Sequence, residues 1–425
     1  MALLIVTLIL LLLFGVPIAI TLGVFCVLYA ALISDAPLAI VPQQLIAGVD
    51  SFLLLAVPMF MLAGELMSRS DMTDRLVQFS RSLVGWIRGG IAQVNLMTNV
   101  LMAGISGSAL ADAAATGSVL IPAMVRSGYS AAFSATVTAF ASGLGPIIPP
   151  SIIMILIGGL TNISIGKMFL GGVLPGLLLA LAYGVTIYIV ARKRRIVTSG
   201  KWSYSTFKVS FLKALPSLGL PLIIAAGFRT GVLTPTEAAG VAVLYTLVVG
   251  VLFLNMSLRS VYRALVEVGA NTGALMFIVG VSAMVGWILI ESQFGDRVVE
   301  LLQGIVSSGT GVLVLSVGIL IALGCVIEIV AVLVLAIPVL APVMDQFNVD
   351  PVHFGVVATI ALALGLISPP FGLTLFLTSR MAGVSIGAFT REALPFYFCM
   401  LVVLGLLILF PGIVTALPNA LMGSK

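Results

Sequence analysis

Long stretches without a charged residue are the feature that most restricts how this chain can fold. Stretches with no Asp, Glu, Lys or Arg include residues 1–34, 89–111, 127–166, 168–191, 238–258, 268–290, 301–327 and 354–379. A helix needs about 20 apolar residues to cross the hydrocarbon core of a bilayer, and most of these stretches are long enough. Buried helices of a large soluble protein would need polar faces between the stretches, yet only 8% of the chain is charged. The sequence therefore predicts an all-α polytopic membrane protein.

Basic residues gather in one segment between two apolar stretches. Residues 192–213 hold seven of the 20 Lys and Arg residues and no acidic residue. Because cytoplasmic loops of membrane proteins carry an excess of Lys and Arg, we expect this linker to be cytoplasmic. The net charge of +5 is concentrated there and does not indicate nucleic-acid binding. Nuclear localisation and binding of anionic membrane lipid are weaker interpretations of the same cluster.

Apolar runs and helix breakers divide the chain into spans and interfacial segments. The N-terminal stretch 1–34 lacks a positive start and a cleavage site, which favours a retained first span. Two amphipathic stretches, 71–87 and 293–304, are expected to form arm helices along the membrane interface. The expected spans lie near 3–33, 51–69, 129–160, 163–191, 213–228, 234–256, 271–291, 351–380 and 390–416.

An internal repeat relates the two halves of the chain. Pro149-Pro150 returns as Pro369-Pro370, and the same shift aligns Leu120–Pro150 with Leu340–Pro370, with identical residues at ten positions. Proline removes a backbone donor and clashes with the preceding turn, so each pair is expected to break a spanning helix. Two related halves, each with a broken helix, are typical of secondary transporters whose site lies at the breaks.

Two further apolar stretches, 89–126 and 305–345, are interrupted halfway by small residues. The first break falls at Gly104–Ser108 and the second near Gly324-Cys325, and neither carries a charged turn residue. Ordinary spans joined outside the membrane are the alternative, but small residues that pack closely favour two re-entrant helical hairpins.

Counting the spans gives the relative orientation of the two halves. Four spans before the basic linker place the N-terminus in the cytoplasm, and the span near 213–228 has no counterpart in the repeat. This single extra crossing inverts the second half. The expected architecture is an inverted structural repeat with two hairpins and two broken helices, the symmetry that alternating-access transporters use.

The expected ion sites lie where the hairpin tips meet the helix breaks. Carbonyl groups one turn before each proline pair lose their helical partners and can bind a cation such as Na⁺, and hydroxyl groups add neutral oxygen ligands. An acidic side chain near the first tip can also hold that tip closed. We expect two or more sodium ions, with candidate ligands Ser108, Asp112, Gly143 and Gly145 in the first half and Gly324, Gly365, Ser368 and Thr374 in the second.

The expected substrate site lies between the two ion sites. Ser151 begins the half-helix after the first break, where free N–H groups and the helix dipole favour an anionic group. Ser106 lies at the first hairpin tip, and Glu328 follows the second tip and can accept hydrogen bonds from substrate hydroxyl groups. Ionisable residues deep in apolar segments are functional candidates. A helix cap for Ser151, and neutral structural acids for Asp112 and Glu328, are the open alternatives.

Other classes of protein fit the sequence less well. No phosphate-binding nucleotide motif is present, so the chain does not hydrolyse ATP itself, although the permease of an ATP-driven system is conceivable. Gly104–Gly107 matches a short motif of rhomboid-type intramembrane proteases, but the single histidine, His353, lies at a span boundary. We therefore expect no enzyme activity, and a channel is the remaining alternative.

Three segments resemble a known family. Ser51–Met67 (SFLLLAVPMFMLAGELM), Gly104–Gly117 (GISGSALADAAATG) and the segment through Ile148–Ser151 are similar to the large membrane subunit, DctM type, of TRAP (tripartite ATP-independent periplasmic) transporters. The likeness covers essentially the whole chain. It implies sodium-coupled import of an organic acid, of sialic acid or C4-dicarboxylate type, across the bacterial inner membrane. It also implies an elevator motion and two partners, a small four-helix membrane subunit and a periplasmic substrate-binding protein.

The halves differ at two site positions, because Ser151 corresponds to Phe371 and Asp112 to Val332. The two ion sites are therefore not chemically equivalent. Of the two candidate substrates, sialic acid is favoured over a C4-dicarboxylate. Glu328 can accept hydrogen bonds from hydroxyl groups, which suits a polyhydroxylated acid better than a small dianion. The expected domains are a first-repeat scaffold with its arm helix (1–87), the first hairpin and broken helix (88–160), further scaffold spans with the second arm (161–304), the second hairpin and broken helix (305–380), and a C-terminal span (381–425).

Overall fold

A computed structural model describes residues 6–7, 10–11, 14–196, 202–230, 232–293, 306 and 308–423. All regular structure in this part of the chain is helical, in agreement with the predicted fold class. The first half contains α2 (Ile18–Leu32), α3 (Ile40–Val49), η1 (Phe52–Leu55), α4 (Ala56–Ser68), α5 (Met72–Val84), α6 (Gly90–Ser106), α7 (Ala109–Arg126), α8 (Ala131–Ser142), α9 (Ile152–Thr161) and α10 (Ile165–Lys193). The second contains α11 (Tyr204–Thr230), α12 (Pro235–Phe253), α13 (Leu258–Glu291), α15 (Gly309–Gly324), α16 (Ile329–Gln346), α17 (Pro351–Ile367), α18 (Leu373–Ala382), α19 (Ile386–Leu409) and α20 (Gly412–Met422).

Seven helices of the described residues are long and apolar enough to cross a membrane, or eight if the bent pair formed by α3 and the η1–α4 segment counts as one span. The helices α8, α9 and α17 are shorter apolar pieces, as expected for spans interrupted at a break. Where the predicted boundaries differ, charge and proline are the reasons. The helix α13 already begins at Leu258, in a charged segment before the predicted start at 271, and the predicted span 390–416 divides at Pro411 into α19 and α20.

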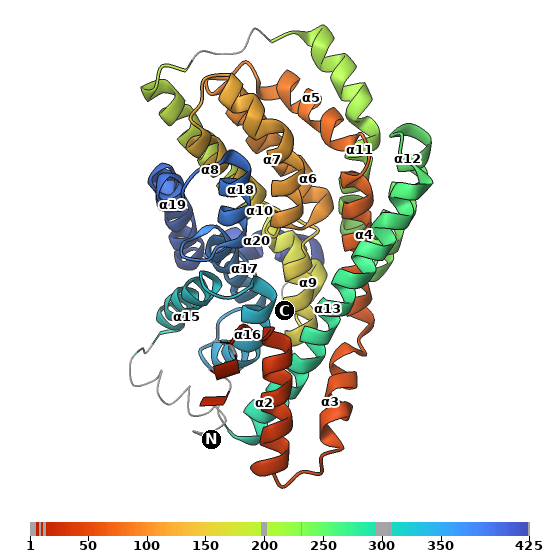
Figure 1. The fold of residues 1–425 in the computed structure, drawn as a ribbon, viewed down its shortest axis with the longest axis vertical. Coiled ribbons are helices and arrows are strands. Elements are labelled where there is room, and N and C mark those ends of the chain that lie inside the picture. Colours follow the sequence, from red (N-terminus) through yellow and green to blue (C-terminus); the bar gives the residue numbers. More distant parts are fainter. Residues whose placement is uncertain are drawn as a thin grey trace.

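The two hairpins enter from opposite ends of the molecule. Figure 1 shows α6 and α7 in the upper half and α15 and α16 in the lower half. The broken helices are inverted in the same way, because α8 lies above α9 whereas α18 lies above α17. The inverted repeat that the span count predicts is therefore present in the fold.

The two repeats interlock through their broken helices. The helix α18 of the second repeat packs against α7 and α8 of the first, and α9 of the first packs against α16 and α17 of the second. Gly143 lies so close to Ile367 that an added Cβ would stand 2.6 Å from its Cδ1 atom. The breaks of the two repeats therefore meet in the interior.

A second group of helices flanks this interlocked body. The helix α13 packs against α2, α3 and α4, and α12 packs against α4 and α11. The contact between α3 and α13 is close, because a Cβ on Gly48 would lie 2.5 Å from the Cβ of Ala283. An ionic contact of Arg69 with Glu65 and Glu267 also joins α4 to α13. We refer to these flanking helices as the scaffold.

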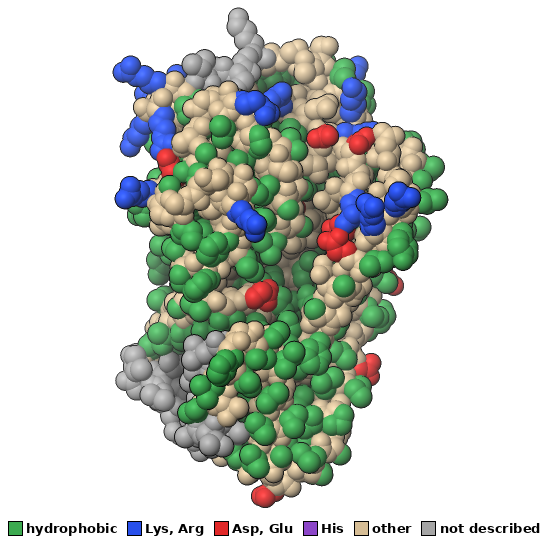
Figure 2. All heavy atoms as spheres, in the orientation of Figure 1, with side chains coloured by type: hydrophobic (Ala, Val, Ile, Leu, Met, Phe, Trp, Pro, Cys, Tyr) green, Lys and Arg blue, Asp and Glu red, His purple; other side chains and the backbone are tan. Residues whose placement is uncertain are grey.

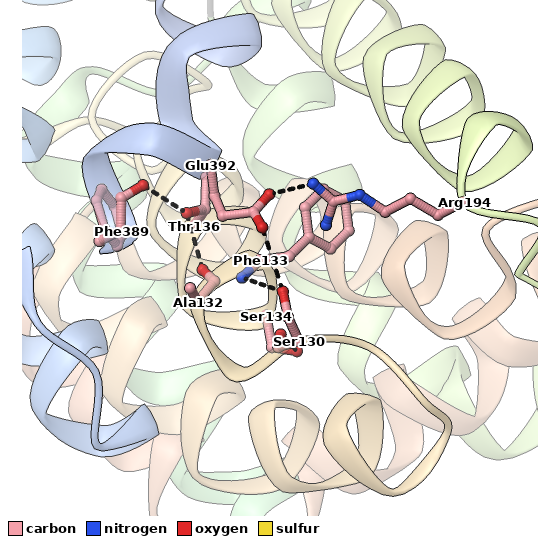
Figure 3. Close-up of polar contacts among 8 residues, drawn as sticks. All are labelled: Ser130, Ala132, Phe133, Ser134, Thr136, Arg194, Phe389 and Glu392. Carbon is pink, nitrogen blue, oxygen red and sulfur yellow. Dashed lines mark hydrogen bonds and ion pairs between the residues drawn. The ribbon is translucent and has the colours of Figure 1, made fainter. Parts of the chain in front are cut away.

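The long helix α10 packs with the interlocked body, against α6, α8, α9, α17, α19 and α20. Figure 3 shows how its C-terminal end is attached to α8 and α19. Arg194 Nη2 donates to Glu392 Oε2 over 2.6 Å, and the guanidinium carbon lies 5.2 Å from the centre of the Phe133 ring. Ser130, the N-cap of α8, donates to the other oxygen of Glu392 over 3.4 Å. By packing, α10 lies with the hairpins and broken helices, although it falls in the segment 161–304 predicted as scaffold.

Lys and Arg side chains gather over the upper part of the molecule in Figure 2, the end at which α10 leads into the basic linker. This distribution agrees with a cytoplasmic upper end. The predicted arm 71–87 is present as the amphipathic helix α5, which buries Met72, Leu76 and Phe79. The predicted second arm, apart from Gln293, lies outside the described residues, as do residues 1–5 at the N-terminus.

Candidate functional site

The tip of the first hairpin lies directly against the first helix break. Gly107, between α6 and α7, has a φ of +61°, and a Cβ at this position would lie 2.6 Å from Pro150 O and 3.3 Å from Ser151 Cα. Only glycine combines this left-handed backbone with so close an approach. Gly64 of α4 packs on the same tip, because its Cβ would stand 3.1 Å from Ser106 Cα. The tip is therefore enclosed by the break on one side and by a scaffold helix on another.

A buried carboxylate joins this tip to the break. Ser106 donates its hydroxyl to Asp112 Oδ1 over 2.6 Å and accepts from Ser108 N over 3.2 Å. Asp112 is fully buried, and its second oxygen, Oδ2, has no hydrogen-bond partner among the described residues. A Cβ on Gly145 in the break would lie 3.0 Å from this Oδ2. A buried charged oxygen without a donor is costly unless a cation lies beside it.

Backbone oxygens are also available at the first break. Among the described residues, no N–H or O–H group donates to the carbonyls of Gly143 or Gly145. The carbonyl of Pro146 is different, because the Ser151 hydroxyl donates to it. The first tip and break therefore bring together Ser106, Ser108, Asp112 and Gly145, whereas Gly143 packs beside Ile367 of α17.

The second tip and break repeat this arrangement with different side chains. Gly324 packs on Gly365, where a Cβ would lie 2.7 Å from Gly324 Cα. Phe371 N donates to Cys325 O over 2.9 Å, which joins the break to the tip through the backbone. Ser368 uses its hydroxyl to donate to Leu364 O over 2.7 Å, and its N–H donates to Gly365 O. No described residue donates to Gly324 O.

Thr374 adds an oxygen near the second break. Its side chain is fully buried in the first turn of α18, and its Oγ1 has no hydrogen-bond partner among the described residues. Asp112 at the first break and Thr374 at the second therefore each bring a buried side-chain oxygen without a described partner to their break.

Four helices begin near the middle of the molecule. The helices α9 and α16 both contribute C-terminal residues, Gly159–Thr161 and Pro338–Asp345, to a cleft at the lower end, so their N-termini point inward. The helices α7 and α18 begin at the hairpin tip and the second break and run toward the upper end. Four positive dipole ends therefore face the same central region from two sides.

Three of these four helices have a side-chain cap. Ser108 caps α7 and Ser151 caps α9, each accepting from the N–H three residues on. Glu328 caps α16, with Oε2 accepting from Val330 N over 2.9 Å and from Ala331 N over 3.2 Å. The fourth helix, α18, starts at Gly372 without a side-chain cap.

The predicted substrate residues therefore have structural tasks as well. Ser151 is fully buried, and its hydroxyl already donates to Pro146 O and accepts from Met154 N. Glu328 is exposed in the described structure and keeps its Oε1 free of described donors. The helix α16 that begins at Glu328 packs against α9, which begins at Ser151. Ser106 is 6% exposed. It lies near Ser151, because the next residue, Gly107, packs against Ser151 Cα.

A buried polar ladder inside the first hairpin is absent from the sequence prediction. Asn95 donates to Thr138 Oγ1 over 2.7 Å and accepts from Asn99 Nδ2 over 2.8 Å. Thr116 donates to Asp112 O over 2.7 Å and approaches Asn99 Oδ1 at 3.3 Å. All four side chains are fully buried. The ladder fixes the helix turn that carries Asp112 to both α6 and α8. Asn95 and Asn99, one helical turn apart in a charge-free stretch, were the feature of the sequence that could have indicated this ladder.

A large cleft lies away from the tips, at the end opposite the basic linker. It has a volume of about 1350 Å³ and separates scaffold residues of α3 and α13 from the C-terminal ends of α9 and α16. Its polar lining includes Asp50, Lys167, Asp345 and Asp350. The predicted site residues do not line it. Because it opens between the scaffold and the interlocked body, the cleft gives the lower end access to the boundary between them.

The inverted pairs of hairpins and broken helices define the chain as a multi-pass membrane transporter. The YdaH transporter of Alcanivorax borkumensis has the same fold, with a TM-score of 0.66 over 90% of each chain at 15% sequence identity. The family model for the tripartite ATP-independent periplasmic transporter, DctM component, matches residues 5–413. The chain belongs to this family.

Relatives of known name support the same assignment. The sialic acid TRAP transporter large permease protein SiaM of Vibrio cholerae is 36% identical over 411 residues, which are 96% of each chain. The C4-dicarboxylate large permease protein DctM of Pseudomonas aeruginosa is 38% identical over 372 residues, 87% of each chain. The chain is thus a TRAP transporter large permease, a multi-pass protein of the inner membrane.

The relatives are transporter permeases and not enzymes, and the protease alternative is not supported. His353 is buried and contacts Leu407 O through Nε2 at 2.9 Å.

Proposed function

We propose that this permease couples the uptake of an organic acid to the movement of Na⁺ down its gradient. The observation that carries the proposal is Asp112 Oδ2, a buried carboxylate oxygen without a donor beside the broken segment at Gly145. A cation at this position would restore the interaction that burial removes. Unwound backbone beside a hairpin tip is the arrangement in which transporters bind coupling ions.

The first site offers oxygens of three kinds. Asp112 supplies a carboxylate, Ser106 and Ser108 supply hydroxyls, and Gly143 and Gly145 supply carbonyls without described donors. All are hard oxygen ligands, which suit Na⁺ better than a transition metal. The described residues contain no cluster of three or more His, Cys, Asp or Glu side chains that could hold such a metal.

The second site is built from neutral groups. Thr374 Oγ1 and Gly324 O are without described donors, while Ser368 and Gly365 complete the pocket between tip and break. A neutral ligand set binds a monovalent cation more weakly than one containing a carboxylate. We therefore assign the tighter sodium site to the first repeat and the weaker to the second.

The acid group of the substrate fits the uncapped end of α18. The N–H groups of Leu373, Thr374 and Leu375 have no acceptor among the described residues, and no side chain caps this end. Free N–H groups at a helix N-terminus bind anionic groups. Ser106, Ser151 and Glu328 would surround the rest of the substrate, and the free Oε1 of Glu328 can accept from a substrate hydroxyl.

Named relatives narrow the class of substrate. They include permeases for sialic acid, C4-dicarboxylates and, at 33% identity, isethionate, all of which are organic anions. A hydroxyl acceptor at Glu328 favours a polyhydroxylated acid, so sialic acid is the preferred substrate and a C4-dicarboxylate the second candidate. We further propose that a periplasmic substrate-binding protein delivers the acid and that a small four-helix membrane subunit supports the scaffold.

Alternating access in this proposal is an elevator motion. The hairpins, broken helices and α10 form one interlocked body, and α2, α3, α4, α12 and α13 form a flanking scaffold. The cleft between them at the lower end would admit substrate, and displacement of the body toward the basic end would release it. A channel would need no such division into two bodies.

Uptake into proteoliposomes tests the coupling. The purified permease, reconstituted with its partner proteins, is supplied with labelled sialic acid under an inward sodium gradient, with sodium replaced by potassium, or with a proton gradient alone. Uptake is expected only with sodium and is expected to saturate with substrate. Full uptake without sodium would overturn the coupling, and uptake that does not saturate would favour a channel.

A further inference from the structure

A small surface hollow at the basic end of the molecule is lined by three exposed charged side chains that have no ion-pair partner among the described residues. It has a volume of about 290 Å³ and lies between the arm helix α5 and the outer end of the first hairpin. Its charged lining is Asp74, Arg81 and Arg126. None of these forms an ion pair or a side-chain hydrogen bond with another described residue. Three unpaired charges facing one cavity are an arrangement that a ligand of mixed charge would complete.

The spacing of the residues places Asp74 and Arg81 on one wall of the cavity and Arg126 on the other. Asp74 and Arg81 are two helical turns apart in α5, so they lie on one face of that helix with Val77 between them. Arg126 is in the last turn of α7, across the cavity. Apolar side chains, among them Ile91 and Val119, complete the lining. The cavity is therefore amphipathic.

Aromatic residues place this cavity at the level of the lipid headgroups. Trp86 follows α5 and is 49% exposed, and Trp202 at the start of the neighbouring α11 segment is 51% exposed. The Phe79 ring of α5 packs at 5.9 Å from the Phe207 ring of α11. Exposed tryptophans are typical of the membrane–water interface, and an amphipathic helix such as α5 lies in that plane.

We propose that this cavity binds the headgroup of a phospholipid that carries both a phosphate and an ammonium group. The phosphate would lie between Arg81 and Arg126, because arginine recognises phosphate through paired N–H donors. The ammonium group would face Asp74, and the acyl chains would follow Val77 and Val119 outward. A headgroup with a phosphate but no ammonium group fits less well, because it leaves Asp74 without a cation. The bound lipid would link the arm helix to the hairpin that the helix precedes.

Lipid retention by the full-length chain tests the proposal. The purified protein is incubated in detergent with phosphatidylethanolamine, phosphatidylglycerol or soluble phosphoethanolamine, and bound molecules are counted by native mass spectrometry. The wild type is expected to retain phosphatidylethanolamine above the other two. Arg81→Gln and Arg126→Gln are each expected to weaken its binding about fivefold, since a basic residue near a lipid surface contributes roughly 1 kcal/mol.

Two further variants separate this site from general surface charge. Arg88→Gln removes an exposed arginine that lies close to α5 but outside the cavity, and it is expected to change nothing. Asp74→Asn is expected to remove the preference and let phosphatidylglycerol bind as well as phosphatidylethanolamine. Equal losses in Arg88→Gln and Arg81→Gln, or equal binding of both lipids by the wild type, would overturn the proposal. Binding of phosphoethanolamine as tight as that of the lipid would exclude a membrane source.

Discussion

Ser106 and Asp112 form a closed pair inside the first hairpin tip, with 2.6 Å between the serine Oγ and the aspartate Oδ1. The pair uses one carboxylate oxygen within the tip itself and leaves the other, Oδ2, directed at the broken segment without a donor. The two oxygens of one side chain thus have different tasks, since the first stabilises the tip and the second is available to an ion.

Asp112→Asn tests the second task. The amide is almost the same size, so the tip should persist, but an amide group at this position donates hydrogen bonds and cannot balance a cation. The sodium concentration for half-maximal uptake is expected to rise at least about tenfold, because contacts to a charged group contribute roughly 1.5–3 kcal/mol. Asp35→Asn, in the turn between α2 and α3 and outside the large cleft, is the matched control. An unchanged sodium dependence in Asp112→Asn would remove the residue from the ion site.

Gly107→Ala tests the contact between tip and break. A Cβ there would stand 2.6 Å from Pro150 O on a backbone with φ +61°. The tip must withdraw from the break, so uptake is expected to be lost. Gly128→Ala is the control, because its φ is +89° but a Cβ would meet nothing within 4 Å. Both variants carry the left-handed strain of about 1–2 kcal/mol, measured by thermal unfolding in detergent. Similar uptake by the two variants would show that the tip contact does not matter.

Glu328→Gln separates a helix cap from a substrate contact. The glutamine carbonyl can still accept from Val330 N and Ala331 N, so α16 keeps its cap while the charge is lost. Uptake is expected to fall at least about tenfold, with thermal stability unchanged within about 0.5 kcal/mol. Glu328→Ala is expected to lose uptake too, and to cost about 1 kcal/mol of stability in addition.

The control for this series is Ser308→Ala, which removes the cap of α15 at the base of the same hairpin. It is expected to lose a similar amount of stability and to keep uptake. Normal uptake by Glu328→Gln would leave this residue with a capping role alone.

Features of the fold that depend on residue type along the chain could be predicted from the sequence. The proline pairs marked both breaks, and Gly104–Ser108 marked a tip that begins at Gly107. The helix α3 was missed because a short segment interrupted by Pro42 and two glutamines resembles a loop. It reaches the length of a span only together with the η1–α4 segment, from which it is bent by 55°. The start of α13 was missed because Arg259, Arg263 and Glu267 ended the apolar run. Glu267 is paired with Arg69, which its position in the sequence does not reveal.

For the candidate site, the sequence indicated which residues take part but not which contacts they make between helices. Helix capping by Ser151 was an open alternative at the sequence level, and the structure contains it. Candidate ligands around each break could be named because prolines free backbone groups locally. Which oxygen then lacks a donor depends on packing between helices, so Asp112 Oδ2 could not be distinguished from Oδ1. The ladder from Asn95 to Thr116 was invisible for the same reason, since its contacts cross from α6 to α7 and α8.

Crosslinking tests whether the interlocked body moves against the scaffold. A Cβ on Gly159 of α9 would lie 3.0 Å from Leu54 Cδ2 in η1, so Leu54→Cys with Gly159→Cys joins the two bodies. Gly171→Cys with Val352→Cys joins α10 to α17 inside one body, since the corresponding Cβ would lie 3.2 Å from Val352 Cγ1. Both pairs are made after replacement of Cys26, Cys325 and Cys399, and are bridged by mercuric ion before uptake is measured.

An elevator requires the first bridge to block uptake and the second to leave it unchanged, because only the first spans surfaces that must slide. Removal of mercury by excess thiol is expected to restore uptake in the first pair. If the first bridge forms fully and uptake continues, the scaffold and the body do not separate during transport. In that case the hairpins would have to open in place, and the free oxygens of Asp112 and Thr374 would belong to gates that bind ions without a displacement of the body.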